Sequence, residues 1–417
     1  MRLLVVSQYF WPENFRINDL VAELVRRGHQ VTVLTGEPNY PLGEIFPEYA
    51  RDKAAFDAYE GAEVIRVPLR PRHKGNLNLA LNYISFVVSA GVRGPWKLRG
   101  RRFDAMFVYQ PSPATVGLPA MLLKAIKRVP MAFWVLDLWP QSLSAVGVTR
   151  SPAILGAVDA LVRLIYRSVD LILVQSRSFV AEIARQAGGS EKIGYFPSWS
   201  DDRAPLDEAE PAPEVAAADG VFSIMFTGNI GDAQDFPAIL DTAHLLRHEP
   251  VRWLIVGDGR RSDWLAAEVA RRELGKQVLL LGRHPLERMP SFLKHADAAL
   301  VALRPEPAFA MTIPGKVQTY LAAGKPILAM IDGEGAEVVR LAEAGLTAPA
   351  GDAAAFAAAV RQMMAMPPVQ RLAMGRRGSE YAQREFDRDS VVSRLENWLE
   401  DLVVRQRTSP PADRPTR

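Results

Sequence analysis

The chain has 417 residues, of which 48% are hydrophobic and 23% charged, and this composition excludes the collagen-like and intrinsically disordered classes. It contains no cysteine, which excludes thiol catalysis, cysteine-ligated zinc and iron–sulfur clusters. The net charge is only +3, but residues 64–103 carry nine Lys and Arg and no acidic residue, a pattern that indicates an anionic partner.

Short apolar runs alternate with helical patterns over the first 200 residues. The N-terminus lacks the features of a signal peptide, and no run approaches the ~18 apolar residues of a spanning helix, so we expect a protein that is cytoplasmic or sits on a membrane face. Buried strands are predicted at residues 3–7, 31–35, 64–67, 105–109, 131–136 and 171–175. Helices are predicted at residues 17–27, 77–92, 115–127 and 154–167. The alternation predicts a doubly wound parallel sheet.

The composition changes at residues 201–220, which hold three prolines, seven acidic residues and few large apolar side chains, so we expect a solvated linker. The alternation then restarts, with strands predicted at residues 222–227, 252–256, 278–281, 298–303 and 326–330. The expected organisation is an N-terminal domain (1–200), the linker (201–220), a C-terminal domain (221–389), a terminal helix (390–405) and a disordered tail (406–417).

The predicted helix at residues 77–92 has two unlike sides. Its polar residues recur on a narrow stripe formed by Asn78, Asn82, Ser85 and Ser89. The rest is a wide apolar side that includes Leu77, Leu81, Ile84, Val87 and Val88. The helix either packs inside the N-terminal domain or, because both of its flanks are basic, docks on an anionic membrane surface.

In open α/β sheets, ligands bind at the carboxyl ends of the strands, so the loops there hold the candidate site residues. The first loop has no glycine, which excludes a dinucleotide cradle, and it offers Glu13, Arg16 and Asn18 instead. Either Asn18 or Asn14 caps the following helix and the charged residues lie on the surface, or these residues bind a polyhydroxylated or phosphorylated ligand, the acceptor. Tyr40, in the turn after the second strand, is a candidate for another wall of the same acceptor site.

Asp137 directly follows the strongly apolar strand at residues 131–136. It either forms an Asx turn or helix cap, or it places a catalytic carboxylate in the cleft. Trp139 lies two residues further on and offers an apolar face on which an acceptor sugar ring can stack.

The C-terminal half offers residues suited to a diphosphate. Pro314 and Gly315 open a helix whose N-terminus favours an anion, and Lys316 adds a full positive charge there. Arg283 follows a strand in the same half. Glycines in three strand-to-helix loops let backbone N–H groups approach a phosphate: Gly228, Gly231, Gly257, Gly259 and Gly335. The sequence thus predicts a diphosphate site, with ordinary turn chemistry as the alternative.

Seven segments together resemble one family over nearly the whole chain: RRGHQVTVLTG (26–36), PNYPLG (38–43), DLWPQS (137–142), FTGNIG (226–231), LIVGDG (254–259), YLAAGKPILAM (320–330) and IDGEGAEVV (331–339). They are similar to the retaining GT-B glycosyltransferases of family 4, and most to the WbuB-like branch, which builds colanic acid, O-antigen and related surface polysaccharides.

The resemblance implies two Rossmann-like domains facing across a cleft. It implies transfer of a sugar, an N-acetylated or deoxy hexose from a UDP-sugar, to a lipid-linked saccharide with retention of configuration. The C-terminal domain would bind the nucleotide, the N-terminal domain would bind the acceptor, and the last helix would return to the first domain. The expected enzyme is metal-independent, needs no cofactor, binds no nucleic acid and works peripherally on the inner face of the cytoplasmic membrane.

The chain departs from the family pattern at three places. The family's two glutamates fall at Met311 and Thr319, its basic pair becomes Asn229 and Gln234, and its histidine is replaced by Leu136-Asp137. The resemblance therefore implies that Lys316 and Arg283 neutralise the diphosphate. Donor contacts would come from Asn229 and, for the ribose and sugar hydroxyls, from Gln318, Thr319, Tyr320 or Glu334.

Two other functions remain open at this point. A UDP-sugar epimerase on the same fold would need a general acid/base pair, for which Asp137 is the one candidate found. A non-catalytic two-domain binding protein would have no need of the basic stretch at residues 64–103.

Overall fold

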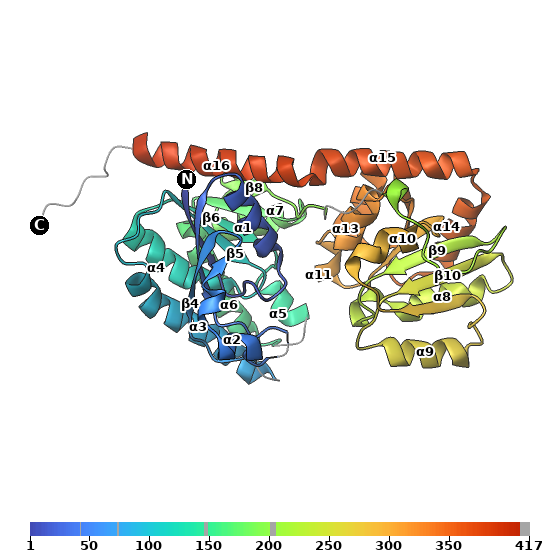
Figure 1. Cartoon of the computed structure of the whole chain (residues 1–417), viewed down its shortest axis with the longest axis horizontal. Coiled ribbons are helices and arrows are strands. Elements are labelled where there is room, and N and C mark those ends of the chain that lie inside the picture. The colour runs from blue at the N-terminus through green and yellow to red at the C-terminus, as the bar shows by residue number, and fades with distance from the viewer. Residues whose placement is uncertain (42, 73–74, 146–148, 201–205, 409–417) are drawn as a thin grey trace, which may run out of the picture. The chain divides into compact units, whose positions relative to one another are not determined.

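The computed structural model describes the chain except residues 42, 73–74, 146–148, 201–205 and 409–417 (Figure 1). The chain divides into two compact units, of which the first consists of Met1–Pro197 and Val391–Arg417 and the second of Ser198–Ser390. Each unit is built on one sheet flanked by helices.

The first unit contains an eight-stranded sheet with the strand order β3-β4-β2-β1-β5-β6-β7-β8. All neighbouring strands pair in parallel except β3 and β4. The strands are β1 (Arg2–Ser7), β2 (Gln30–Gly36), β3 (Ala58–Tyr59), β4 (Ala62–Val67), β5 (Ala105–Gln110), β6 (Met131–Val135), β7 (Leu171–Val174) and β8 (Ile193–Tyr195). The central strands are buried on both faces, as their continuous apolar sequences predict.

Helices of the first unit connect these strands, and α3 and α4 lie side by side on the face of the sheet opposite α1 (Figure 1). They are α1 (Arg16–Arg26), α2 (Pro47–Arg51), α3 (Asn76–Lys97), α4 (Gly117–Lys127), α5 (Gln141–Ala145), α6 (Pro152–Ser168) and α7 (Phe179–Ala187). Gly28, with φ of +87°, closes α1, because its N–H bonds the Val25 carbonyl while the next N–H reaches back to Leu24.

The second unit contains a six-stranded sheet with the order β11-β10-β9-β12-β13-β14, all parallel. Its strands are β9 (Phe222–Thr227), β10 (Val251–Val256), β11 (Val278–Gly282), β12 (Ala298–Ala302), β13 (Ile327–Met330) and β14 (Gly345–Ala348). Its helices are α8 (Phe236–Leu245), α9 (Ser262–Arg271), α10 (Met289–Leu293), α11 (Pro307–Ala310), α12 (Gly315–Ala322), α13 (Gly333–Leu341), α14 (Ala353–Ala365) and α15 (Pro368–Phe386). The predicted parallel α/β architecture of both halves is confirmed.

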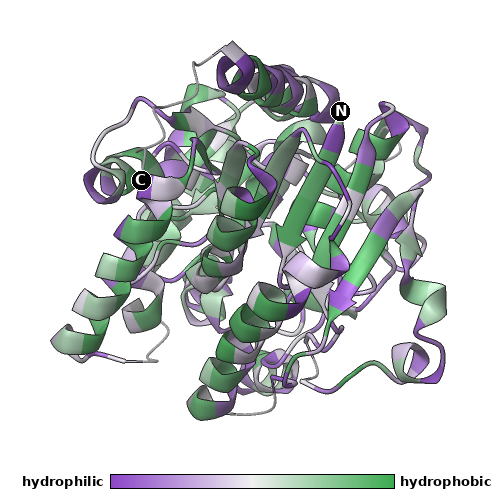
Figure 2. Cartoon of the chain, turned by 90° about the vertical axis from the view of Figure 1, so that its left-hand side faces the viewer, coloured by the Kyte–Doolittle hydropathy of each residue, from purple (hydrophilic) through white to green (hydrophobic). Residues whose placement is uncertain are grey.

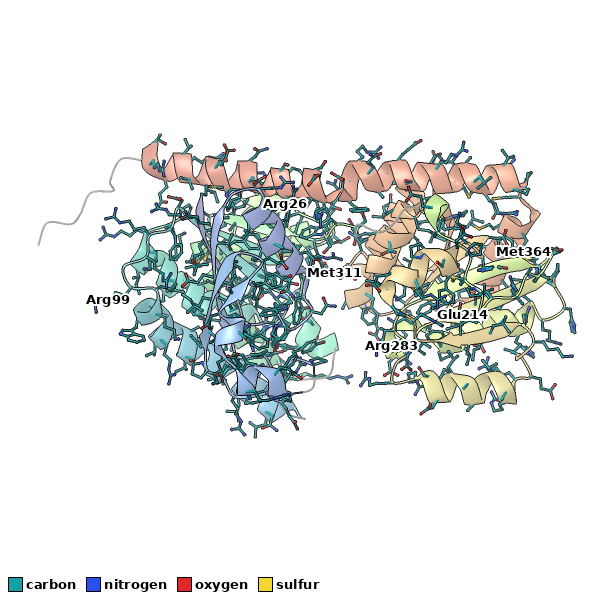
Figure 3. The ribbon with its side chains drawn as sticks, viewed as in Figure 1. Arg26, Arg99, Glu214, Arg283, Met311 and Met364 are labelled. Atoms are coloured by element: carbon teal, nitrogen blue, oxygen red, sulfur yellow. The ribbon has the colours of Figure 1, made fainter. Side chains whose placement is uncertain are left out.

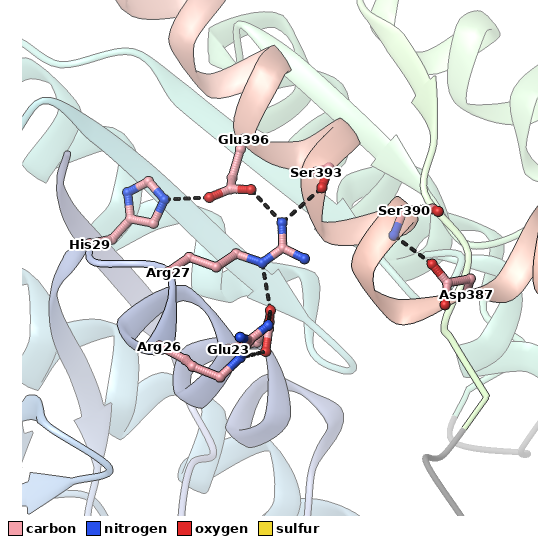
Figure 4. A network of polar contacts seen from close by, with 8 residues as sticks. All are labelled: Glu23, Arg26, Arg27, His29, Asp387, Ser390, Ser393 and Glu396. Carbon is pink, nitrogen blue, oxygen red and sulfur yellow. Dashed lines mark hydrogen bonds and ion pairs between the residues drawn. The ribbon is translucent and has the colours of Figure 1, made fainter.

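The last helix, α16 (Arg388–Thr408), packs on the first unit although it follows the second in sequence. Glu396 holds it there, since one carboxylate oxygen lies 2.6 Å from Nη1 of Arg27 and the other 2.6 Å from Nε2 of His29 (Figure 4). The helix begins two residues before the predicted start and runs to Thr408. Of the predicted disordered tail, residues 406–408 are therefore helical, and the rest lies outside the described residues.

The expected linker at residues 201–220 is a wrong prediction for its described part, 206–220, which packs on the second unit. Ala212 and Val215 are buried in the core of that unit. Nε2 of His295 lies 2.9 Å from the Ala212 carbonyl oxygen, and Arg288 pairs with Glu214. The acidic composition suggested a solvated segment, but the small apolar residues between the acids are sufficient to dock it.

Candidate functional site

Helix α12 is fixed to the end of β9 by a buried tyrosine. The Tyr320 hydroxyl accepts a hydrogen bond from the Thr227 N–H at 2.9 Å and lies 3.1 Å from the Thr227 Oγ1. Lys316 lies one helical turn before Tyr320 and therefore on the same side of α12. The sequence places Lys316 at the carboxyl edge of the sheet, where ligands of open α/β sheets bind.

Lys316 is an uncompensated cation at this edge. Its Nζ lies 4.7 Å from the centre of the Phe226 ring, and a Cβ at Gly228 would lie 3.2 Å from the same nitrogen. No carboxylate pairs with it in the described part of the chain. Burial lowers the pKa of Lys316 to about 8. A partly buried ammonium without a counter-ion favours an anionic ligand, which would restore its charge balance.

The first turn of α12 adds two backbone donors beside this cation. The N–H groups of Gly315 and Lys316 have no acceptor among the residues that the structure describes. Together with the positive end of the helix dipole, they form an anion-binding helix N-terminus of the kind that holds phosphates.

The N–H groups of the loop glycines, which were predicted to bind a phosphate, already donate hydrogen bonds within the protein. The N–H groups of Gly228, Gly231 and Gly257 donate to the Val256 carbonyl, the Gln234 side chain and the Gly282 carbonyl, respectively. The Gly259 N–H is equally committed, to the side chains of Asp258 and Ser262.

Glycine is required in these loops because they touch. A Cβ at Gly257 would lie 1.8 Å from the Gly228 oxygen, and a Cβ at Gly259 would lie 2.3 Å from the Ile230 oxygen. The prediction that these four N–H groups cradle a phosphate is therefore wrong. The glycines instead allow the loops after β9 and β10 to pack closely, and Gly228 lies against the Lys316 side chain.

The other predicted donor residues divide into two groups. Gln318 is buried and donates to the Ser198 carbonyl at 2.6 Å, and Gly335 is buried against the Pro314 and Ile331 side chains, so neither is available to a ligand. Arg283 is exposed after β11 (Figure 3), and Asn229 is exposed in the loop after β9. Thr319, in the second half of α12, and Glu334, in the first turn of α13, are partly exposed.

The second unit also has a cavity of about 660 Å³, which opens at the opposite edge of this sheet, before β12 and β13. It is basic, but two of the cations that line it have protein partners: Lys325 bonds the Ala296 carbonyl at 2.7 Å, and Arg371 lies 3.7 Å from Asp297. Strand topology places ligands of open sheets at the carboxyl edge, so we assign the site to the loops around Lys316.

The first unit has a cavity of about 330 Å³ at the carboxyl edge of its own sheet. Its walls include Tyr9, Phe15, Tyr40, Tyr83 and Trp139. Tyr9 and Phe15 stack with ring centres 5.3 Å apart, and the Tyr83 and Trp139 rings lie 6.2 Å apart. We name this the aromatic pocket. Such walls suit the flat apolar faces of sugar rings.

Asp137 lies in the aromatic pocket at the end of β6. Its Oδ2 accepts a hydrogen bond from Nε1 of Trp139 at 3.2 Å, and its own carbonyl accepts one from Gln110. Burial raises the pKa of Asp137, although hydrogen bonds from Ser142, Trp139 and Ser112 act in the other direction. The carboxylate is thus oriented by its neighbours and faces the cavity that a sugar would enter.

Three predicted acceptor residues do not line the aromatic pocket, and direct contact was a wrong prediction for them. Glu13 is 1% exposed and accepts the N–H groups of Phe10, Asn39 and Tyr40 at 3.1, 2.8 and 2.8 Å.

Asn18 is also buried, where its Oδ1 accepts the Trp11 N–H and its Nδ2 donates to the Glu13 carbonyl. Arg16 pairs with Asp19 at 3.0 Å. These residues fix the loops that carry the pocket wall. The capping alternative is also wrong, because no side chain of the described residues caps the start of α1. Of the predicted acceptor residues, Tyr40 and Trp139 line the pocket.

Sequence reasoning missed several pocket residues. Ser112 follows β5, so the rule of strand ends could have found it. Tyr83 and Arg72 come from α3 and the segment before it, and no local signal indicated that they would reach the pocket. Among the described residues, no group of three or more His, Asp or Glu side chains is arranged to hold a metal ion.

The two halves of the chain match two family models. Residues 14–199 match a glycosyl transferase 4-like domain, and residues 221–366 match the glycosyl transferases group 1. The chain is 25% identical to the putative colanic acid biosynthesis glycosyl transferase WcaI of Escherichia coli over 417 residues, which cover 95% of this chain and 99% of that protein. It is 29% identical to the probable glycosyltransferase WbjE of Pseudomonas aeruginosa over 255 residues, or 57% of this chain and 62% of that one.

Solved structures show the same fold over nearly the whole chain. HepE of Anabaena, solved in complex with UDP, superposes with a TM-score of 0.69 at 13% identity, covering 96% of this chain and all of HepE. At this level of identity the likeness concerns the fold, two α/β domains with parallel sheets.

Proposed function

We propose a reaction from the premise that this chain is a two-domain glycosyltransferase of the GT-B fold with a role in polysaccharide biosynthesis. The proposed reaction is the transfer of a sugar from a nucleoside diphosphate sugar to a lipid-linked saccharide. The observation that carries the proposal is Lys316, a partly buried cation that no carboxylate of the described residues pairs with, beside the open N-terminus of α12. The second unit would bind the donor, and the first would bind the acceptor.

A uridine nucleotide is the donor base that we propose, with an N-acetylated or deoxy hexose as the sugar. The UDP complex of HepE supports the base, because HepE shares the fold of both domains. The exposed Asn229 and Arg283 and the partly exposed Thr319 and Glu334 would contact the phosphates and hydroxyl groups.

Lys316 would drive the departure of the nucleotide. When the bond from the sugar to the β-phosphate breaks, negative charge develops on the phosphate oxygens. Lys316, the first N–H groups of α12 and the exposed Arg283 would stabilise that charge electrostatically. A metal ion is then not required, which is part of the proposal.

Retention of configuration is the stereochemical outcome that we propose. The departing phosphate would accept the proton of the acceptor hydroxyl on the same face of the sugar, so no carboxylate has to form a covalent intermediate. Asp137, in the aromatic pocket, would orient the acceptor hydroxyl by accepting a hydrogen bond from it.

The test is to incubate the full chain with a panel of nucleoside diphosphate sugars and a polyprenyl-diphosphate-linked saccharide. We expect one donor to release its nucleoside diphosphate and lengthen the saccharide, with the anomeric configuration of the donor retained in the product by NMR. An epimerised sugar nucleotide formed without acceptor would show an epimerase instead. Binding without turnover of any donor would show a ligand-binding protein.

A further inference from the structure

Helix α3 is built with its polar side inward. Asn82 is fully buried, where its Nδ2 donates to the Arg70 carbonyl at 2.6 Å and its Oδ1 accepts from Gln8 at 2.7 Å. The Ser85 hydroxyl accepts the Arg70 N–H at 2.8 Å. The predicted polar stripe of this helix therefore faces the protein, and the opposite side of the helix is left to solvent.

That opposite side is apolar. Leu77, Ile84, Val88, Val92 and Trp96 are 74%, 57%, 58%, 70% and 72% exposed. They recur at spacings of seven and then four residues, which aligns them along one side of the helix. Soluble proteins seldom leave so many large apolar side chains of one helix in water.

Helix α4 continues the same surface. It packs beside α3, where a Cβ at Gly94 would lie 3.8 Å from Leu123, and it exposes Leu122 and Ile126 by 44% and 49%. Figure 2 views the chain from the side where α3 and α4 lie in Figure 1 and shows hydrophobic residues along the outer helices of this unit. We name the seven side chains on α3 and α4 the apolar face: Leu77, Ile84, Val88, Val92, Trp96, Leu122 and Ile126.

The apolar face is bordered by positive charge. Residues 64–136 contain twelve Lys and Arg but one acidic residue, Asp104. Some of these cations are buried or paired within the unit, as Arg101 is with Glu63 and Lys124 with Asp170. Arg93, Lys97 and Arg99 are exposed at the C-terminal end of α3, and Arg99 projects outward from the unit (Figure 3). An apolar strip with a cationic border and an exposed tryptophan at its end matches the interface of an anionic bilayer.

We propose that the apolar face docks the first unit on an anionic lipid bilayer, with α3 and α4 lying in the plane of the interface. The occupant is a bilayer and not a second copy of the chain, because two such faces brought together would oppose their cationic borders. Among the described residues no helix is long and apolar enough to cross a membrane, and in-plane docking needs none.

Docking would bring the acceptor to the aromatic pocket. The inner side of α3 contributes Leu79 and Tyr83 to that pocket while its outer side carries the apolar face. A saccharide attached to a lipid in the same bilayer would then be presented near the pocket. The docking itself rests on the apolar face and stands even if the proposed transfer fails.

The test is co-sedimentation of the full chain with vesicles of phosphatidylcholine, alone or mixed with phosphatidylglycerol. We expect the wild type to sediment with the anionic vesicles, and less so as salt rises, because the Debye length falls from ~10 Å at 0.1 M to ~3 Å at 1 M. The double variant Val88→Glu with Val92→Glu should lose at least about tenfold in affinity, since it places charges in the apolar face.

The matched control is Leu341→Glu with Val369→Glu, which changes two residues of the second unit that are 60% and 70% exposed. This control should bind vesicles as the wild type does, and both double variants should bind UDP equally, which shows that they are folded. A wild type that stays in the supernatant at low salt, or a V88E/V92E variant that sediments like the wild type, would overturn the proposal. So would a wild-type dimer that V88E/V92E dissociates while neither protein binds vesicles.

Discussion

At the scale of single residues, Lys316 illustrates how a binding group destabilises the protein that carries it. Burial lowers its pKa from the ordinary lysine value to about 8. Between about pH 8 and 10.5 the unfolded chain holds a proton that the folded chain has released, so the charged form at pH 7 disfavours folding. A bound diphosphate would reverse this effect by pairing with the ammonium.

We therefore predict that Lys316→Met stabilises the free protein and weakens donor binding. One pKa unit corresponds to about 1.36 kcal/mol, and solvent screening reduces the effect, so the gain should be about 1–2 kcal/mol in urea unfolding at pH 7. UDP affinity measured by calorimetry should fall about 10- to 100-fold, because a hydrogen bond to a charged group contributes about 1.5–3 kcal/mol. Lys276→Met, at an exposed lysine, is the control and should change neither quantity.

Asp137 is the second residue whose role a substitution can separate from stability. We predict that Asp137→Asn lowers kcat about 10- to 100-fold and leaves the melting temperature within ~2 °C of the wild type, because burial disfavours the charge that the substitution removes. The measurements are steady-state kinetics and calorimetric melting. A parallel loss of stability and activity would instead support the turn or capping role.

At the scale of elements, the wall of the aromatic pocket depends on the buried carboxyl group of Glu13, which does not itself line the pocket. Glu13 joins the loop after β1 to the loop after β2 through the N–H groups of Phe10, Asn39 and Tyr40. Burial raises the pKa of Glu13 to about 7, against the effect of these hydrogen bonds.

We predict that Glu13→Ala destabilises the protein by about 2–4 kcal/mol, because it leaves three buried N–H groups without an acceptor. The folded chain keeps a proton on Glu13 between about pH 4.5 and 7 that the unfolded chain has lost, so the contribution of Glu13 to stability falls as the pH rises through this range. The difference between wild type and variant in urea unfolding should be larger at pH 5 than at pH 8. The exposed Glu48→Ala should stay within ~0.5 kcal/mol of the wild type at both values.

Sequence patterns located most elements because the central strands are continuous apolar runs. β9 was predicted to the residue, and α1 within one residue at each end. The short edge strands β8 and β14 were missed, since three or four residues with glycine carry little pattern. The side of α3 that faces inward was also beyond prediction, because it is decided by Gln8 and by the Arg70 backbone, which the helix sequence does not contain.

The site was predicted where the signal is local and missed where it depends on distant partners. Lys316 follows from a Pro-Gly helix start, which a sequence displays directly. The hydrogen bond from Gln318 to the Ser198 carbonyl joins residues 120 positions apart, and no local sequence pattern indicates it. The glycine loops were recognised as special, but their reason is the approach of one loop to another.

At the scale of the whole molecule, charge and apolar surface are divided between the two halves. The first 200 residues carry 24 basic and 16 acidic side chains, whereas the remaining 217 carry 26 and 31. The basic half is also the half with the apolar face. The half proposed to bind the acceptor is thus the one suited to an anionic membrane. The half with Lys316 is proposed to bind the donor, which does not require contact with a membrane.

We predict that the V88E/V92E variant is impaired only with acceptor in a bilayer. Its apparent KM for a lipid-linked saccharide in anionic vesicles should rise at least about tenfold, while its KM for the nucleotide sugar stays unchanged, because the local concentration of acceptor depends on docking. With a short-chain, water-soluble acceptor the variant should match the wild type. Equal impairment with both acceptors would mean that the substitutions disturb the aromatic pocket.

The most direct test of donor binding at Lys316 is hydrogen–deuterium exchange of the full chain with and without UDP. The N–H groups of Gly315 and Lys316 lack acceptors in the described structure and should exchange fast in the free protein. We predict that UDP slows exchange in peptides spanning the start of α12 and the loop after β9, and that Lys316→Met abolishes this protection. Protection confined to the basic cavity around Lys325 and Arg371, or to the aromatic pocket of the first unit, would contradict it.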